Sequence, residues 1–425
     1  MKLNIKPFLL FGFLLGASLA TGRDLFFQLT YVLGAVLILS FLWVWYSTRW
    51  VSLERHERAQ RTSVGRIHEE RLNLRNQGRL PKLWLELRDH SDLPNHGAGR
   101  VVDFLPGHGE RSWIVRTLCG QRGRFTLGPV TLRSSDPFGI FESTRELNVV
   151  QHLVVWPQMV DLPTFSPPIG RLTGGEALQR RTHHITTNVS GVREYYPGDS
   201  FNRIHWKSTA RHGRLIVKEF ELDPSADIWL FLDLDKGVQT GTAVEDTSDT
   251  SLLPLWVSQA TQQIQPTTEE YGVVVVASIA KHFIRRGKSV GLITYGQRRE
   301  VLMADRGERQ LNKILETLAV VRASGNIPLA EVLAAESPTF GRNVTVVVVT
   351  PSVWTDWVSM VREMARRTLQ PVAVTLDAQS FGGAVSGDNV KAALISSNVP
   401  IYSVKKNDDL AYALGQKLDL GRARV

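Results

Sequence analysis

Two long apolar runs open the chain and differ from everything that follows. Residues 7–21 are almost without charge, and residues 25–46 form a second, longer run that ends in the letters LILSFLWVWY. Only a Gly-Arg-Asp turn separates the two runs. Since about 20 apolar residues in a helix cross the hydrocarbon core of a bilayer, the pattern predicts a transmembrane helical hairpin over residues 1–48.

Basic residues flank the hairpin on both sides. Lys2 and Lys6 precede it, and a run of arginines follows it, namely Arg49, Arg55, Arg58 and Arg61. Positive charge gathers on the cytoplasmic side of membrane helices, so we expect a two-helix protein of the cytoplasmic membrane with the bulk of the chain in the cytoplasm. Two other interpretations stay open: a signal peptide cut after residues 17–20, and a buried hairpin of a soluble protein.

The pattern after the apolar runs favours short strands. Residues 49–79 are polar and basic, and we expect a juxtamembrane segment there. Residues 80–162 show short alternating stretches, such as LWLELR from Leu83, and turn residues separate them at intervals of about ten residues. This spacing predicts a β-sandwich-like domain, followed by a loop linker over residues 163–190.

The C-terminal half has the pattern of an α/β domain. Residues 228–232 and 344–350 are nearly uninterrupted apolar runs, and helical patterns such as residues 273–286 alternate with them. Strands buried on both faces indicate a doubly wound, mostly parallel sheet, here over residues 224–425. Residues 236–271 interrupt the rhythm with a polar composition that predicts a flexible insertion.

Charge and cysteine content exclude some classes of protein. The net charge of +9 over 425 residues is modest, and its concentration between Arg49 and Arg79 favours a negatively charged membrane surface over nucleic acid. The single Cys119 excludes an intrachain disulfide and a metal cluster built on cysteines. We therefore expect no nucleic-acid partner and no cofactor.

The densest run of unusual residues lies between Gly191 and Phe220, within a segment that we delimit as residues 191–223. A Tyr-Pro-Gly-Asp turn ends at Asp199, which, like the next residue, suits the start of a helix. Gly213 suits the end of that helix, and a strand is expected to follow it.

Within this helix Arg203, Lys207 and Arg211 are four residues apart and predict one basic stripe. Acidic side chains that can face the stripe are Glu194, Asp199 and Glu219. Three interpretations are open: a salt-bridged connector between domains, a surface that binds a partner protein, and a catalytic or phosphate-binding site.

Two more residues of this run, His205 and Trp206, bear on the choice between these interpretations. His205 has no Ser or Cys at a spacing that indicates a catalytic dyad, and Trp206 is expected in the core.

A family resemblance enters through this run. The residues that carry it are Arg193, Glu194, Tyr195, Gly198, Asp199, Arg203, Ile204, His205, Trp206, Lys207, Ala210, Arg211, Gly213, Leu215, Val217, Lys218, Glu219 and Phe220. Their pattern resembles the signature of the bacterial domain-of-unknown-function family 58. Residues 122–129 and 136–141 resemble two further motifs of that family, in which we expect Gly and Pro to shape turns and Phe138 and Phe141 to fill a core.

The resemblance implies an architecture and a partner. It implies a membrane hairpin, a β-rich segment, the signature and a von Willebrand factor A-like domain, and it implies work beside a MoxR-type AAA+ ATPase and often a transglutaminase-like membrane protein. On this interpretation the chain is an interaction or scaffold protein in an envelope-related or complex-assembly process, and not an enzyme. The alternative is an enzyme or an acidic-ligand-binding protein that uses the polar groups between Asp199 and Arg211.

Von Willebrand factor A domains often bind a divalent cation through oxygen ligands, and the resemblance implies where those ligands would lie. Asp233 fits the first position, but Asp235 replaces a Ser and Gly237 has no side chain. Ile327 stands where a Thr is implied, and Pro351 lies in a run that lacks an Asp. We therefore expect a degenerate metal site in which the two aspartates cap backbone groups or pair with an Arg.

Overall fold

The computed structural model describes residues 2–57, 59–168, 189–197, 199–220, 227–242, 264–341 and 344–418. The chain divides near residue 158 into two compact units. The first unit holds the N-terminal helices and a β-sandwich, and the second holds the signature segment and an α/β domain.

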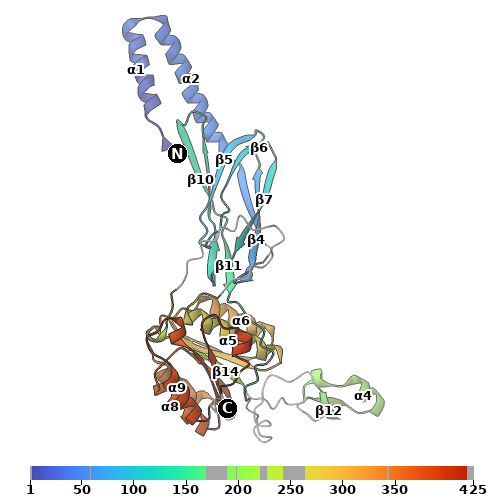
Figure 1. Cartoon of the computed structure of the whole chain (residues 1–425). Coiled ribbons are helices and arrows are strands. Elements are labelled where there is room, and N and C mark those ends of the chain that lie inside the picture. The colour runs from blue at the N-terminus through green and yellow to red at the C-terminus, as the bar shows by residue number, and fades with distance from the viewer. Residues whose placement is uncertain are drawn as a thin grey trace. The chain divides into compact units, whose positions relative to one another are not determined.

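Two apolar helices begin the first unit. α1 (Lys6–Thr21) and α2 (Asp24–Ser47) pack against each other (Figure 1). Gly22 ends α1 with a φ of 63°, a conformation that costs glycine little. α2 has 24 residues and a mean hydropathy of 2.2, so it is long and apolar enough to cross a membrane. α1 has 16 residues and is shorter than such a span, so a second crossing stays a prediction.

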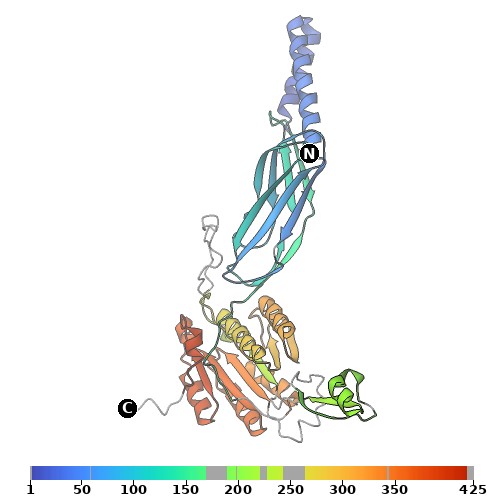
Figure 2. The same ribbon diagram turned by 90° about the vertical axis from the view of Figure 1, so that its right-hand side faces the viewer.

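The strands of the first unit form two layers (Figure 2). One sheet contains, in order, β1 (Lys2–Leu3), β10 (Phe141–Leu147), β9 (Val130–Ser135), β5 (Lys82–Asp89) and β6 (Arg100–Leu105). The other strands are β2 (Val51–Glu57), β4 (Ile67–Asn76) and β7 (Glu110–Leu118), and β3 (Arg61–Ser63), β11 (Gln151–Trp156) and β8 (Gly123–Leu127). Alternate residues of β5 and β4, such as Leu85 and Leu72, meet in one buried core.

The sandwich begins earlier than the pattern predicted. Residues 51–76 were expected in a polar segment before the domain, yet they form three of its strands, and β4 pairs with β7 over its whole length. In β4 the buried positions include His68 and Glu70 as well as Leu72 and Leu74. Charged residues at inward positions hide the alternation that identifies a strand.

A buried cluster of charged side chains explains those positions. Arg55 Nη2 lies 2.7 Å from Asp89 Oδ1, and Arg55 Nε lies 3.4 Å from Glu70 Oε2. His96 Nε2 lies 3.1 Å from Glu70 Oε1 and 3.3 Å from Asp89 Oδ2, while its Nδ1 lies 2.8 Å from the hydroxyl of Thr117. Arg55 is therefore part of the sandwich, and not the free juxtamembrane cation that the sequence suggested.

The cluster changes the pKa values of its members. Burial lowers the pKa of His96, but hydrogen bonds to Asp89 and Glu70 outweigh it and leave that pKa raised. Burial raises the pKa of Asp89, but hydrogen bonds from His96 and Ser91 and the Arg55 charge bring it down to about 2. The carboxyl groups of Glu70 and Asp89 thus face two basic side chains, Arg55 and His96, inside the cluster.

The end of α2 is attached to the sandwich by polar contacts. Lys82 Nζ donates to the carbonyl oxygen of Tyr46 at 2.5 Å and lies 3.3 Å from the centroid of the Tyr46 ring. The Tyr46 hydroxyl accepts from the amide of Leu80 at 3.0 Å. Burial lowers the pKa of Lys82 to about 8. These contacts join the helical pair and the sandwich into one unit.

The α/β domain of the second unit contains a six-stranded sheet. Its strands, in spatial order, are β16 (Arg299–Asp305), β15 (Val290–Tyr295), β14 (Ile228–Leu232), β17 (Thr345–Thr350), β18 (Gln370–Leu376) and β19 (Ile401–Val404). All neighbouring pairs are parallel except β15 and β16. The helices are α5 (Thr268–Arg285), α6 (Glu308–Val320), α7 (Leu329–Glu336), α8 (Asp356–Arg366), α9 (Asp388–Ser396) and α10 (Leu410–Ala413).

Alternate residues of the central strand β14 enter opposite faces of the sheet. Trp229 and Phe231 join a core with Trp357 and other residues of α7, α8 and α9. On the other face Leu232 lies against Gly272 of α5, where an added Cβ would come within 3.1 Å of its side chain. Helices thus cover both faces, and the predicted doubly wound α/β architecture is present.

The structure describes only the ends of the expected linker and insertion. Phe165, at the start of the expected linker, is fully buried against Phe283 and Tyr402. At the end of the expected insertion Thr267 caps α5, accepting from the amide of Glu270 at 3.2 Å. The rest of the linker, residues 169–188, and residues 243–263 of the insertion lie outside the described residues.

The charge cluster leads to a prediction about pH. Because the folded protein binds the His96 proton more tightly than the unfolded chain does, this contribution to stability is complete below about pH 6.5 and is lost as pH rises through the raised pKa. We expect His96→Gln to flatten the fall of melting temperature above that pH. The control is His56→Gln, whose side chain is 63% exposed. Equal slopes for wild type and His96→Gln would contradict the prediction.

Candidate functional site

The signature segment forms a small antiparallel unit. β12 (Val189–Glu194) pairs with β13 (Ile216–Phe220), with Glu194 opposite Ile216, and between them lie η1 (Phe201–Arg203) and α4 (Trp206–His212) (Figure 1). Gly213 ends α4 with a φ of 66°, as predicted from the sequence. The strand expected after it is β13.

The turn after β12 is closed by an ion pair. The guanidinium of Arg193 donates to both carboxylate oxygens of Asp199 at 2.7 and 2.8 Å. Asp199 Oδ2 also accepts from the amide of Tyr196 at 3.0 Å. Asp199 therefore holds the turn. Of the two residues that we expected at a helix start, Ser200 is the N-cap residue, and it precedes η1. Two parallel hydrogen bonds between Arg and a carboxylate fix geometry as well as adding energy.

The helix begins later than predicted, at Trp206, and His205 is its N-cap residue. His205 Nδ1 lies 2.6 Å from the hydroxyl of Ser208. This pair was not predicted from the sequence, because a Ser three residues after a His is the spacing of the first turn of a helix and does not indicate a catalytic dyad. Among the described residues no carboxylate contacts His205, and an activated serine needs such an orienting group, so the pair stabilises the helix start.

The predicted basic stripe is shorter than three residues. Arg203 belongs to η1 and precedes α4, so only Lys207 and Arg211 share a helix face. Both of these side chains are exposed, and no acidic side chain of the described part of the chain pairs with them. Glu194 pairs instead with Arg214, which is not part of the stripe.

The remaining signature residues divide into those the structure describes and those it does not. Tyr195 is half-buried and stacks on Phe201, with 5.9 Å between ring centroids, and Lys218 is half-buried on β13. Gly198 lies outside the described residues, as do the side chains of Arg203 and Glu219.

Large aromatic side chains of the segment face solvent. Trp206 is 67% exposed, so the prediction that it lies in the core is wrong. Tyr196 and Phe201 are exposed to a similar extent, and α4 buries none of its residues. Lys207 and Arg211 are exposed in the same segment, and we call this set of exposed rings and cations the signature surface.

A second candidate site lies at the carboxyl end of β14. The sheet order places β14 between β15 and β17, which is the switch point where ligands bind in doubly wound sheets. Asp233, directly after β14, accepts from the Thr350 hydroxyl at 2.6 Å and from the Asp235 amide at 3.1 Å. Asp235 in turn accepts from the amide of Gly237 at 2.9 Å. Both aspartates thus cap backbone groups, as one of our two expectations proposed.

The electrostatics of this site differ from those of a typical cation site. Burial raises the pKa of Asp233 to about 6, despite the hydrogen bond from Thr350. The described residues contain no group of three His, Cys, Asp or Glu side chains placed to hold a metal ion. Each carboxylate oxygen of Asp233 accepts a hydrogen bond from within the protein, and the degenerate metal site stays a prediction.

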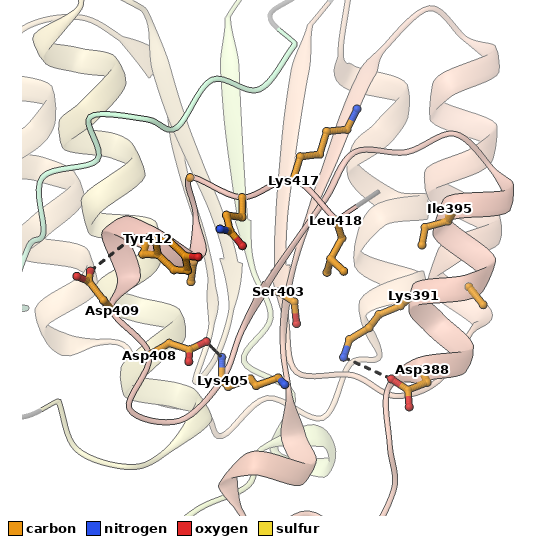
Figure 3. Close-up of a pocket in the computed structure, with 14 residues that line it drawn as sticks. Asp388, Lys391, Ile395, Ser403, Lys405, Asp408, Asp409, Tyr412, Lys417 and Leu418 are labelled. Carbon is orange, nitrogen blue, oxygen red and sulfur yellow. Dashed lines mark hydrogen bonds and ion pairs between the residues drawn. The ribbon is translucent and has the colours of Figure 1, made fainter. Parts of the chain in front are cut away.

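A third candidate is a groove of about 1120 Å³ beside the edge strand β19 (Figure 3). Its charged lining residues are Lys391, Lys405, Lys417, Asp388, Asp408 and Asp409. Asp408 accepts from the Lys405 amide at 2.8 Å, and Asp409 caps α10. The lining contains three lysines and three aspartates, so its formal side-chain charges cancel and favour neither an anion nor a cation. We therefore take the signature surface as the stronger candidate.

Taken together, an apolar N-terminal helix, a β-sandwich, a signature hairpin and an α/β domain define a multidomain chain of mixed α/β class. Residues 191–253 match the family described as "Protein of unknown function DUF58". The "Uncharacterized protein YeaD" of Bacillus subtilis (strain 168) is 26% identical over 215 residues, which are 49% of this chain and 45% of that protein. The match thus spans about half of the relative's length, and the two findings support membership of the DUF58 family.

Solved structures resemble parts of the chain only distantly. The CARDB domain of the PF1109 protein from Pyrococcus furiosus is 14% identical, covers 25% of this chain and 86% of that chain, and gives a TM-score of 0.19. The pilus adhesin SpaC from Lactobacillus rhamnosus GG, in its open conformation, is 10% identical. That match covers 45% of this chain and 28% of the adhesin, and it gives a TM-score of 0.30. Scores this low carry no argument about the fold.

The geometry at Asp233 leads to a prediction. The pKa of Asp233 is about 6 in the folded protein and near 4 in the unfolded chain. The folded state therefore loses stability as pH rises from about 4 through about 6, because the buried carboxyl must ionise. We expect Asp233→Asn to melt at or above the wild-type temperature at pH 7.5, and we expect Mg²⁺ or Mn²⁺ to leave the wild-type melting temperature unchanged. An EDTA-reversible rise with Mg²⁺ that Asp233→Asn abolishes would contradict both expectations, since bound ligands stabilise the folded state.

Proposed function

We propose that this chain is a membrane-anchored interaction protein that binds a MoxR-type AAA+ ATPase through the signature surface. The observation that carries the proposal is the exposure of three rings, Trp206, Tyr196 and Phe201. The same segment exposes Lys207 and Arg211, which no acidic side chain in the described part of the chain pairs. Interfaces are enriched in Trp, Tyr and Arg, and such residues supply most of the binding energy. On this proposal the signature is a binding surface and not a clamp between domains.

The resemblance to the family supports the rest of the proposal. It implies the ATPase partner, a von Willebrand factor A-like character for the α/β domain and, as a second partner, a transglutaminase-like membrane protein. The strand order with an antiparallel β16 at one edge agrees with a doubly wound domain of that kind. We propose no catalytic residue and no cofactor, and we place the chain in an envelope-related or complex-assembly process.

Anchoring is proposed to use both α1 and α2. α2 alone is long enough to cross the bilayer. On the proposal α1, which packs against it, would carry the chain across first, and α2 would return the chain to the side on which it began. With Lys2, Lys6 and Arg49 at the ends of the pair, the sandwich and the α/β domain would lie in the cytoplasm.

The signature surface can be tested by substitution. Because Trp206, Lys207 and Arg211 are exposed, we expect their alanine variants to keep the free energy of unfolding within about 0.5 kcal/mol of wild type while capture of the ATPase from solubilised membranes falls. Trp354→Ala is the matched control, since Trp354 is 65% exposed in the α/β domain. Captured protein is identified by mass spectrometry and by ATP hydrolysis.

The results distinguish two roles for the signature segment, a binding surface and a structural clamp between domains. Early melting of all three variants would mean that the signature is a structural clamp, while unchanged capture with unchanged melting would remove the partner surface. An ATPase lost equally from Trp354→Ala would show a general defect and would likewise count against the proposal.

The orientation in the membrane has its own test. Met303→Cys places a thiol at a position that is 71% exposed in the α/β domain. A membrane-impermeant thiol reagent should label it only after the cells are opened. Labelling in intact cells would place the domain outside the cytoplasm and would contradict the proposed topology.

A further inference from the structure

The turn between β9 and β10 lies beside the two apolar helices. The Phe141 ring, at the start of β10, contacts Phe8 of α1 and Phe41 of α2 edge to face, with 5.8 and 5.7 Å between ring centroids. Ile140 and Phe141 share a buried cluster with residues of α2. Figure 1 shows this end of β10 next to α1 and α2. The turn is therefore part of the helical layer as well as of the sandwich.

The chain's first residues hold the turn from the other side. Leu3 of β1 lies opposite Phe141, and the Asn4 amide donates to the carbonyl oxygen of Ile140 at 2.9 Å. α1 begins two residues later, at Lys6. The start of α1 and the turn consequently lie at one level along the helical pair.

That level is beyond the aromatic residues that mark a membrane interface. Lower on β10, the Ser143 hydroxyl lies 2.9 Å from that of Thr48, which follows α2. From Thr48 to Phe41 a helix rises about 10 Å. Trp45 and Tyr46 lie between these two levels, and Trp and Tyr gather where membrane meets water. The turn thus reaches past this belt toward the apolar part of α2.

Three backbone amides of the turn donate hydrogen bonds within the protein. The buried Asp136 carboxylate accepts from the amides of Phe138 at 2.9 Å and Phe141 at 2.6 Å. Gly139 donates to the carbonyl oxygen of Asp136 at 3.1 Å, and Pro137 has no amide hydrogen. Irregular backbone in lipid needs such internal partners, because no water is present to replace them.

The tip of the turn nevertheless exposes a large aromatic side chain. Phe138 is 68% exposed, so the expectation that it fills a core is wrong, while Phe141 is buried as expected. Leu3 and Ile5, which lie at the same level, are 50% and 63% exposed. These exposed apolar side chains lie beside a helix that can cross a membrane. Lipid around that helix would cover them and remove their contact with water.

We propose that the turn of residues 136–140 is inserted into the bilayer, where Phe138 contacts lipid acyl chains. Lys6, which begins α1 at the same level, would extend its ammonium group to the lipid headgroups. The inference rests on the proposed anchoring by α2 and goes beyond it. The sandwich would then be held at the membrane by its own turn as well as by the helices, which fixes its orientation relative to the bilayer.

Lipid-dependent quenching of a fluorophore tests the insertion in the full-length chain. Single cysteines are placed by Phe138→Cys, Val32→Cys and Trp354→Cys in a Cys119→Ser background, labelled with a small fluorophore and reconstituted into phosphatidylcholine–phosphatidylglycerol nanodiscs. Val32 is 63% exposed on α2 and reports anchoring, while Trp354 reports the α/β domain. Spin-labelled acyl chains should quench the Phe138 label to a degree comparable with Val32 and should leave Trp354 unchanged.

Other outcomes separate the two hypotheses. If Val32 is quenched by lipid but Phe138 is quenched only by aqueous iodide, the insertion is wrong and the anchoring stands. If neither quencher reaches Phe138, protein covers the turn, as in a second copy or a partner, and the lipid contact is wrong. If lipid does not quench Val32, the anchoring fails and the insertion fails with it. Phe138→Leu, with an unchanged melting temperature, controls for folding.

Discussion

The first unit depends on the compensation of charges inside its sandwich. Arg55, Glu70, Asp89 and His96 come from β2, β4, β5 and the segment after β5, and their side chains are buried among apolar residues. An isolated buried charge would cost several kcal/mol, and loss of one partner leaves another uncompensated. The register of β2 on β4 is constrained by this cluster, since a slip of one residue would turn Arg55 and Glu70 to solvent.

The same constraint operates where the sandwich meets the helices. Tyr46 ends the apolar helix with a carbonyl group that the Lys82 ammonium satisfies, and its hydroxyl accepts from the Leu80 amide. At the other contact, Asp136 satisfies backbone amides of a turn that packs against Phe8 and Phe41. At both places where the sandwich approaches the helical pair, these polar groups therefore have partners within the protein.

The signature segment differs from the sandwich because its polar contacts do not enclose its large aromatic side chains. Its internal contacts, such as Arg193 with Asp199 and His205 with Ser208, stabilise a turn and a helix start, and they leave the rings of Trp206 and Phe201 in solvent. A short helix that buries none of its residues adds little to a core. The segment thus has the character of a presented surface, whereas Asp233 at the switch point of the sheet is enclosed by its own hydrogen bonds.

Periodicity in the sequence was sufficient to identify the apolar helices, the α/β alternation and the strand-rich middle, because these elements bury one continuous type of side chain. The residue type alone was sufficient to predict that Gly213 ends α4, since glycine adopts the left-handed conformation at a helix end at little cost. The strands β2 and β4 could not be recognised, because their inward positions carry Arg55 and Glu70, whose partner Asp89 lies on another strand. Only the tertiary structure decided that Trp206 and Phe138 are exposed while Phe141 is buried, because an aromatic residue in a sequence does not reveal whether protein, lipid or a partner will cover it.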